Sequence, residues 1–165
     1  YVQASTMYRI LFALVLLLPL TPVSSEAFVF RKIVYCSPIE GFIHWQGKPL
    51  VNLKVTRLLR SGGFENDEYQ DEVQTDSEGH FKFQAVAERR FLRPDLFSAN
   101  PRVSQVIEAL YEGKPYTIWS YSKHDFNLGT ESKDGVIRIN CDLAKFEEFS
   151  FGRIVRCQHN GNQPL

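Results

Sequence analysis

The side chains most capable of covalent chemistry in this chain are its three cysteines, Cys36, Cys141 and Cys157. An oxidising compartment would allow one disulfide bond and leave one thiol over. Cys141 and Cys157 lie in two late strand-like segments joined by a short connector, so we favour a bond between them across neighbouring strands. A Cys36–Cys157 bond, tying the first strand to the last, is the alternative. Because the sequence has no Cys-x-x-Cys motif, we expect a structural role rather than a catalytic thiol.

The histidines are too scattered to indicate a metal site, which needs clustered His, Cys or carboxylate ligands; they are His44, His80, His124 and His159. His44 and His80 fall on the outward phases of strand-like segments, where surface residues are expected. The sequence also lacks a Gly-x-Ser-x-Gly nucleophile elbow. We therefore expect no catalytic residue, no metal and no cofactor. Weak calcium binding by the acidic stretch 65–78 stays an alternative to a solvated loop.

Molecular recognition is the remaining chemistry. The stretch 65–78 is acidic and the stretch 89–93 is basic, so the two could steer a partner or could pair with each other. Aromatic residues and arginine dominate the energetics of binding interfaces. The residues that we predict to contact a partner are Glu65, Asp67, Glu68, Tyr69, Arg90, Arg93, Trp119 and Tyr121.

The N-terminal stretch predicts where these residues act. After Met7 come Arg9, an apolar run at 10–18, and Ser25-Glu26-Ala27, which together are typical of a cleaved signal helix. The run is shorter than the ~20 apolar residues of a transmembrane helix, although an uncleaved anchor is the alternative. We expect residues 1–27 to be a signal peptide, with 1–6 an upstream extension or non-native. Residues 28–165 would then form one periplasmic or secreted domain, with no membrane contact after cleavage.

Charge excludes another class of partner. The chain carries 19 Lys and Arg against 19 Asp and Glu, a formal net charge of zero. Nucleic-acid-binding proteins usually present a concentrated basic surface. We therefore expect no nucleic acid and, as partner, another protein such as a toxin or an envelope component.

Most of the mature chain is expected to form β-strands. Apolar residues alternate with polar ones, which is the signature of half-buried strands; the segments are 39–46, 53–57, 80–85, 106–111, 116–121, 137–143 and 149–157. We expect a loop over 61–78, a long ordered loop over 88–106 with a helical turn near 94–97, and a short helical connector over 142–148. The pattern predicts an all-β fold, an antiparallel sandwich of about seven strands, transthyretin-like or Ig-like.

A family resemblance supports this fold. The segments Gly41-Phe42-Ile43, Gly47-Lys48-Pro49-Leu50-Val51-Asn52-Leu53-Lys54-Val55 and Thr75-Asp76-Ser77-Glu78-Gly79-His80-Phe81-Lys82-Phe83 resemble the opening half of transthyretin-like sandwiches, including the carboxypeptidase regulatory-like and Cna-B-type domains. The second half is similar to small secreted bacterial proteins, some of which look like immunity partners of secreted toxins. The hydroxyisourate hydrolases of the transthyretin-like group need a His/Arg cluster and a Tyr-Arg-Gly-Ser-like C-terminus. This chain ends in the different sequence 159–165, so that activity is not expected.

The sequence thus predicts a binding protein without catalytic activity, and an immunity protein that neutralises a delivered toxin is the first hypothesis. A carbohydrate- or cell-surface-binding accessory domain is the second; it requires an exposed row of aromatic rings that includes Trp119. A hydrolase with an unrecognised site is the third; it requires a deep pocket in which a histidine lies beside a carboxylate.

Overall fold

The computed structural model describes residues 30–62, 64–91 and 102–161, with the side chain of Glu65 left out. The expected signal segment 1–27 therefore lies outside the described residues. One short 3-10 turn, η1 (Glu65–Asp67), interrupts a succession of strands. The strands are β1 (Arg31–Cys36), β2 (Ile39–Trp45), β3 (Lys48–Pro49), β4 (Lys54–Arg60), β5 (Glu68–Gln74), β6 (His80–Phe83), β7 (Val86–Arg90), β8 (Val103–Tyr111), β9 (Lys114–Lys123), β10 (Ile137–Asp142), β11 (Phe146–Phe149), β12 (Gly152–Val155) and β13 (Gln158–His159).

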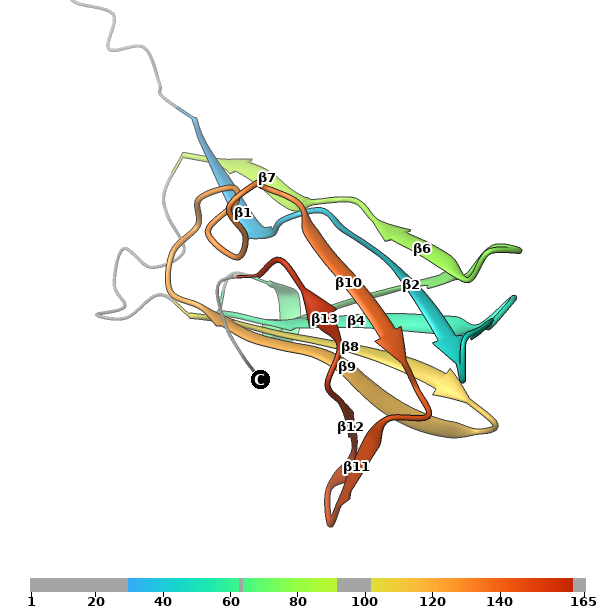
Figure 1. Ribbon diagram of the computed structural model, residues 1–165. Helices are drawn as coiled ribbons and strands as arrows, with labels where there is room; N and C mark the ends of the chain where they lie inside the picture. The colour runs from blue at the N-terminus through green and yellow to red at the C-terminus, as the bar shows by residue number, and fades with distance from the viewer. Residues whose placement is uncertain (1–29, 63, 92–101, 162–165) are drawn as a thin grey trace, which may run out of the picture.

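The strands form two facing sheets, which confirms the predicted all-β sandwich (Figure 1). One sheet has the order β13-β10-β2-β3, with β6 also paired to β2, and the other has the order β11-β12-β9-β8-β4-β5. Strands β1 and β7 form a separate two-stranded sheet. Most pairs are antiparallel, as expected, but β10 runs parallel to β2 and β12 runs parallel to β9. The sandwich is therefore built from mixed sheets.

The core lies between the inward faces of the two sheets. Ile39, Ile43 and Ile139 from one sheet, together with Val55 and Ile107 from the other, are buried. Each such side chain contributes about 1.5–3 kcal/mol by leaving water. The alternation of these residues along β2, β4, β8 and β10 is why the period-two pattern predicted these four strands.

The parallel pairing of β2 with β10 depends on a glycine. A Cβ atom at Gly41 would lie 2.1 Å from the carbonyl oxygen of Ile139, which no real side chain could occupy. The absence of a side chain at Gly41 therefore allows the two central strands of the first sheet to approach closely.

A bulge shifts the side-chain phase of β9. Ile107 lies opposite Trp119 and Glu108 lies opposite Thr117, so Ile118 is the extra residue. Both Ile118 and Trp119 are consequently buried. A strict two-residue alternation would place Trp119 on the face opposite to Ile118, and the bulge is the physical reason why both side chains are in the core.

The acidic stretch contains a strand rather than only a loop. Strand β5 pairs with β4 along its whole length, and three cross-strand ion pairs accompany this pairing. They are Lys54–Glu72 at 2.5 Å, Arg57–Asp71 at 2.5 Å and Arg60–Glu68 at 3.0 Å. A loop over 61–78 was predicted because polar residues occupy both faces of β5. The side chain of Asp71 points inward and is partly buried, which is favourable because it forms an ion pair with the buried Arg57.

The predicted helical connector over 142–148 is also wrong. The backbone N–H of Lys145 donates to the carbonyl of Asp142 in a tight turn, and β11 begins directly afterwards at Phe146. The predicted strand over 149–157 is divided among the end of β11, β12 and the approach to β13. Of the predicted long loop, residues up to Arg90 belong to β7 and residues from Val103 belong to β8, while the expected helical turn near 94–97 lies outside the described residues.

The favoured disulfide bond is confirmed. Cys141 in β10 is bonded to Cys157, which directly precedes β13, with a Cα–Cα distance of 4.5 Å. The bond excludes the alternative Cys36–Cys157 pairing and leaves Cys36 as a buried free thiol. It also fixes the short edge strand β13 beside β10.

Within the described part of the chain, no helix has the length and apolar character needed to cross a membrane.

Candidate functional site

A hairpin made of β11 and β12 projects from one end of the six-stranded sheet (Figure 1). Its strands pair from Phe146–Val155 out to Phe149–Gly152, so Ser150 and Phe151 form the tip. Gly152 has a φ of 148°, a conformation that favours glycine and lets the chain turn back tightly. The hairpin therefore places two phenylalanines at its outermost point.

The two phenylalanines are stacked on each other and exposed to solvent. The ring centroids of Phe149 and Phe151 are 5.3 Å apart with an interplanar angle of 15°. Phe149 is 42% exposed and Phe151 is 78% exposed. Single apolar residues are common on protein surfaces, but paired rings on a projecting tip are typical of a contact site.

Charged side chains hold the hairpin in shape. Arg153 donates to Glu148 at 2.8 Å, and Arg156 forms an ion pair with Glu147 at 2.8 Å. The Arg153 guanidinium also lies 5.4 Å from the ring centroids of Tyr116 and Phe146. These contacts join the hairpin to the body of the protein and leave a balanced set of charges around the aromatic tip.

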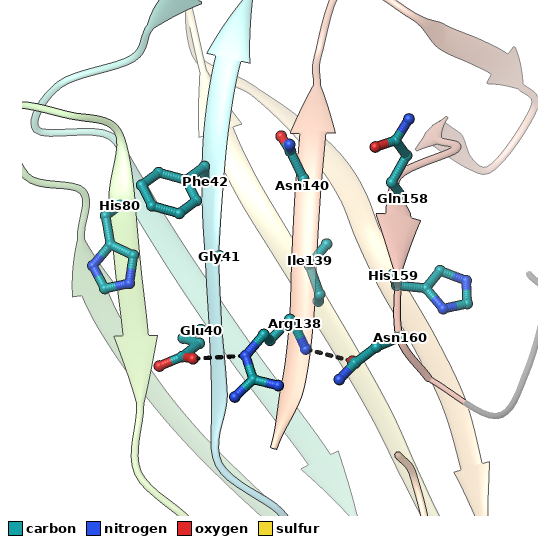
Figure 2. A pocket seen from close by; sticks show the side chains of 10 residues that line it. All are labelled: Glu40, Gly41, Phe42, His80, Arg138, Ile139, Asn140, Gln158, His159 and Asn160. Atoms are coloured by element: carbon teal, nitrogen blue, oxygen red, sulfur yellow. Dashed lines mark hydrogen bonds and ion pairs between the residues drawn. The ribbon is translucent and has the colours of Figure 1, made fainter. Parts of the chain in front are cut away.

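A second candidate surface is a groove of about 570 Å³ on the outer face of the other sheet (Figure 2). Strand register places Phe42 of β2 beside His80 of β6 and beside Asn140 of β10, and Asn140 beside Gln158 of β13. The lining residues are Glu40, Gly41, Phe42, His80, Arg138, Ile139, Asn140, Gln158, His159 and Asn160.

One row across this groove combines aromatic rings with amides. The rings of Phe42 and His80 are 5.0 Å apart, and Phe42 is 46% exposed. The side chains of Asn140 and Gln158 form no hydrogen bond with any other described residue, and both residues are exposed. The row therefore offers an apolar face next to amide groups that are free to bind a ligand.

The adjacent row is charged and internally paired. Arg138 donates to Glu40 at 3.1 Å (Figure 2). Arg138 also donates to Asp134 at 2.9 Å, and the ammonium group of Lys82 lies 3.8 Å from the carboxylate of Glu40. The backbone N–H of Arg138 donates to the side chain of Asn160 at 2.8 Å. Two positive and two negative groups therefore balance in this row.

A smaller hollow of about 300 Å³ adjoins the groove and places His44 near Asp142. Partial burial raises the pKa of Asp142, but hydrogen bonds from the backbone N–H groups of Gln46 and Ala144 outweigh it and hold the pKa below its ordinary value. The remaining lining residues are Asn140, Lys145, Arg156 and Gln158. A histidine therefore lies beside a carboxylate, but in an open hollow whose lining has no hydroxyl or thiol nucleophile.

The residues of the acidic stretch that were predicted to contact a partner differ in their surroundings. Glu68 pairs with Arg60, and the hydroxyl of the half-buried Tyr69 donates to Asp71. Asp67 lies at the exposed end of η1. Three acids of the stretch 65–78 pair with β4: Glu72 with Lys54, Asp71 with Arg57 and Glu68 with Arg60.

The other predicted contact residues are dispersed. Arg90 forms an ion pair with Glu88 at 2.6 Å, and Trp119 is only 1% exposed. Tyr121 stacks on Trp119 with 6.0 Å between ring centroids and is half-buried. Trp119 is therefore a core residue, which corrects its prediction as a contact residue. Arg93 and the side chain of Glu65 lie outside the described residues.

Neither the hairpin tip nor the groove was predicted from the sequence. The signal for the hairpin was present, because Phe149-Ser150-Phe151-Gly152 is an alternating segment that ends in a turn residue. Over residues 30–62, 64–91 and 102–161, no group of three or more His, Cys, Asp or Glu residues is placed to hold a metal ion.

Comparison with known proteins identifies one family. A family model described as "Domain of unknown function (DUF6795)" matches residues 39–146, which is more than half of the chain. The match begins with β2 and ends where β11 begins. A search of curated proteins finds no match.

Proposed function

The chain belongs to the DUF6795 family, and we propose that it is a non-catalytic binding protein that contacts another protein through the tip of the β11–β12 hairpin. One observation carries the proposal: Phe149 and Phe151 are stacked at the tip and exposed. Burying such rings in a partner releases apolar surface from water and yields about 1.5–3 kcal/mol for each fully covered ring. The hairpin is held by ion pairs, so little flexibility is lost on binding.

The surroundings of the tip favour a protein partner over a lipid surface. Glu147 and Glu148 are balanced by Arg153 and Arg156. Membrane-binding surfaces usually carry an excess of basic residues, whereas protein interfaces place aromatic anchors inside a polar rim. The tip has the second arrangement.

The proposed place of action is outside the cytoplasm. The Cys141–Cys157 disulfide supports it, because such bonds form and persist in oxidising compartments. The signal pattern of residues 1–27 supports the same location. Together they favour a periplasmic or secreted protein.

The proposed scaffold is a transthyretin-like sandwich. The segments that carry the resemblance fall on β2, on β3 with β4, and on β6, all within one sandwich. In such a scaffold function resides on the presented turns and faces. Neutralising a delivered toxin is the specific role that we propose for the hairpin, because a projecting aromatic tip can enter and block a concave site on an enzyme.

Site-specific photo-crosslinking tests this proposal. Phe151 would be replaced by p-benzoylphenylalanine, which keeps an aromatic ring at the tip, and Val51, which is 51% exposed on a different turn, would carry the same group as a control. We expect one protein from the extracytoplasmic fraction of the producing cells to be labelled from position 151 and not from position 51. Equal labelling from both positions, or none from position 151, would overturn the proposal. Inhibition of the labelled protein's enzymatic activity would establish the toxin-blocking role.

A further inference from the structure

We propose that the groove across β6, β2, β10 and β13 is a second binding site, and that it takes an uncharged oligosaccharide. The site is on the outer face of the five-stranded sheet, whereas the hairpin belongs to the six-stranded sheet. Its volume, about 570 Å³, falls within the range of about 300–1,000 Å³ that is usual for small-ligand sites. The inference does not depend on the proposed protein partner.

The aromatic end of the groove suits the apolar face of a sugar ring. Phe42 is 46% exposed and is held against His80 of the neighbouring strand, with 5.0 Å between ring centroids. Pyranose rings present C–H groups on one face, and these pack favourably against the negative face of an aromatic ring. Phe42 therefore provides a platform on which one sugar unit can stack.

The amide end of the groove suits hydroxyl groups. The side chains of Asn140 and Gln158 have no hydrogen-bond partner among the described residues, and Figure 2 shows them in the same row as Phe42. Each amide offers two N–H donors and one acceptor oxygen, so it can bind a sugar hydroxyl that accepts a hydrogen bond or one that donates it. Neighbouring strands are about 4.8 Å apart, close to the length of one sugar unit in a chain. Successive units could therefore meet Phe42, Asn140 and Gln158 in turn.

The charge balance of the groove favours an uncharged ligand. The carboxylate of Glu40 is engaged by Arg138 and Lys82, and Arg138 also engages Asp134. An anionic ligand would have to compete with these carboxylates for the same cations. A hydroxyl group can instead accept or donate a hydrogen bond beside the pairs without breaking them.

The floor of the groove is fixed before any ligand binds. The close parallel pairing of β2 with β10 sets the positions of Phe42 and Asn140. The Cys141–Cys157 bond holds Gln158, the residue that directly follows Cys157, beside β10. A site whose side chains lie on paired and cross-linked strands loses little conformational entropy on binding.

Isothermal titration calorimetry with cellotetraose and with chitotetraose, both uncharged, tests this inference, and the anionic tetragalacturonate serves as the charged comparison. We expect at least one uncharged probe to bind with a Kd below about 1 mM. We expect Phe42→Ala to weaken this binding about tenfold or more. Phe151→Ala, which removes a more exposed ring from the hairpin on the other sheet, should leave the affinity for the sugar unchanged.

The outcomes separate this site from the hairpin. Failure of both uncharged probes to bind, tighter binding of tetragalacturonate than of either, or an unchanged Kd for Phe42→Ala would each overturn the inference. Because Phe42 is on the outer face, its removal should preserve the fold, which thermal unfolding of the variant checks. Asn140→Ala gives a second readout: we expect a loss of binding with an unchanged unfolding midpoint. None of these results changes the labelling expected from position 151, so the two proposals can fail independently.

Discussion

The ammonium group of Lys123 lies 3.1 Å from the carboxylate of Glu131, and both side chains are fully buried. Ser37 donates to this carboxylate from its backbone N–H at 3.1 Å and from its hydroxyl at 2.7 Å, and the Gln105 amide donates at 2.9 Å. The ion pair thus links the end of β9, the segment before β10, and the junction between β1 and β2. A buried charge is tolerated only when it is paired and hydrogen-bonded, and this cluster satisfies both conditions.

Lys123→Met should lower the free energy of unfolding by about 3–5 kcal/mol, because it leaves the buried Glu131 carboxylate without a counter-charge. Urea denaturation followed by circular dichroism measures the change. Lys133→Met is the matched control, because Lys133 is exposed and lies in the connection between β9 and β10 that also contains Glu131. This substitution should change the free energy of unfolding by less than about 0.5 kcal/mol. Equal effects of the two substitutions would contradict a structural role for the pair.

Protonation of Glu131 should lower the free energy of unfolding at low pH. Burial raises the pKa of this carboxyl, but Lys123 and the hydrogen bonds from Ser37 and Gln105 outweigh burial and hold the pKa below its ordinary value. A carboxyl with a lowered folded-state pKa stabilises the fold above its unfolded pKa of about 4.3 and loses that contribution as the pH falls further. We expect the urea midpoint to decrease below about pH 4. Glu131→Gln should show a smaller decrease over this range, and an identical pH profile in the two proteins would exclude Glu131 as the source.

Loss of the disulfide should destabilise the fold by about 3 kcal/mol. The bond closes a loop with a sequence separation of 16 residues, and cross-links of this span restrict the unfolded chain by roughly that amount. Cys157→Ser, or reduction with dithiothreitol, should therefore lower the urea midpoint. Dithiothreitol should cause no further decrease in Cys157→Ser, and a further decrease would mean that another reducible bond contributes.

The free thiol of Cys36 should be unreactive in the folded protein. It is fully buried, and burial raises its pKa to about 12, so the reactive thiolate is scarce at neutral pH. Iodoacetamide at pH 8 should leave Cys36 unmodified by mass spectrometry until urea is added. Rapid alkylation in native buffer would show that this region opens readily.

Much of the fold could be predicted because inward residues alternate strictly. Ile39, Ile43 and Ile139 lie on the inward phase of their strands, and the favoured cysteine pair proved to be bonded. Strand β5 was missed because its inward Asp71 is polar, and only the distant Arg57 makes that burial favourable. Such a pairing between strands is invisible to a local pattern of hydrophobicity.

The candidate surfaces were harder to predict for a similar reason. The bulge at Ile118 directs the side chain of Trp119 into the core, and no residue type in that segment indicates a bulge. The groove exists because β10 lies parallel to β2, which places Asn140 beside Phe42 although they are far apart in the sequence. The sequence around Lys123 and Glu131 likewise does not distinguish these two residues from ordinary surface residues, although the fold buries both side chains.

If the stacked phenylalanines Phe149 and Phe151 serve binding rather than folding, their removal should weaken binding and leave the fold intact. The most direct measurement compares wild type with Phe149→Ser/Phe151→Ser, determining both the free energy of unfolding and the affinity for the protein labelled from position 151. We predict that unfolding changes by less than about 1 kcal/mol because both rings are exposed, while affinity falls at least a hundredfold, or about 2.7 kcal/mol. Unchanged affinity, or a loss of stability that accounts for the loss of binding, would contradict the claim.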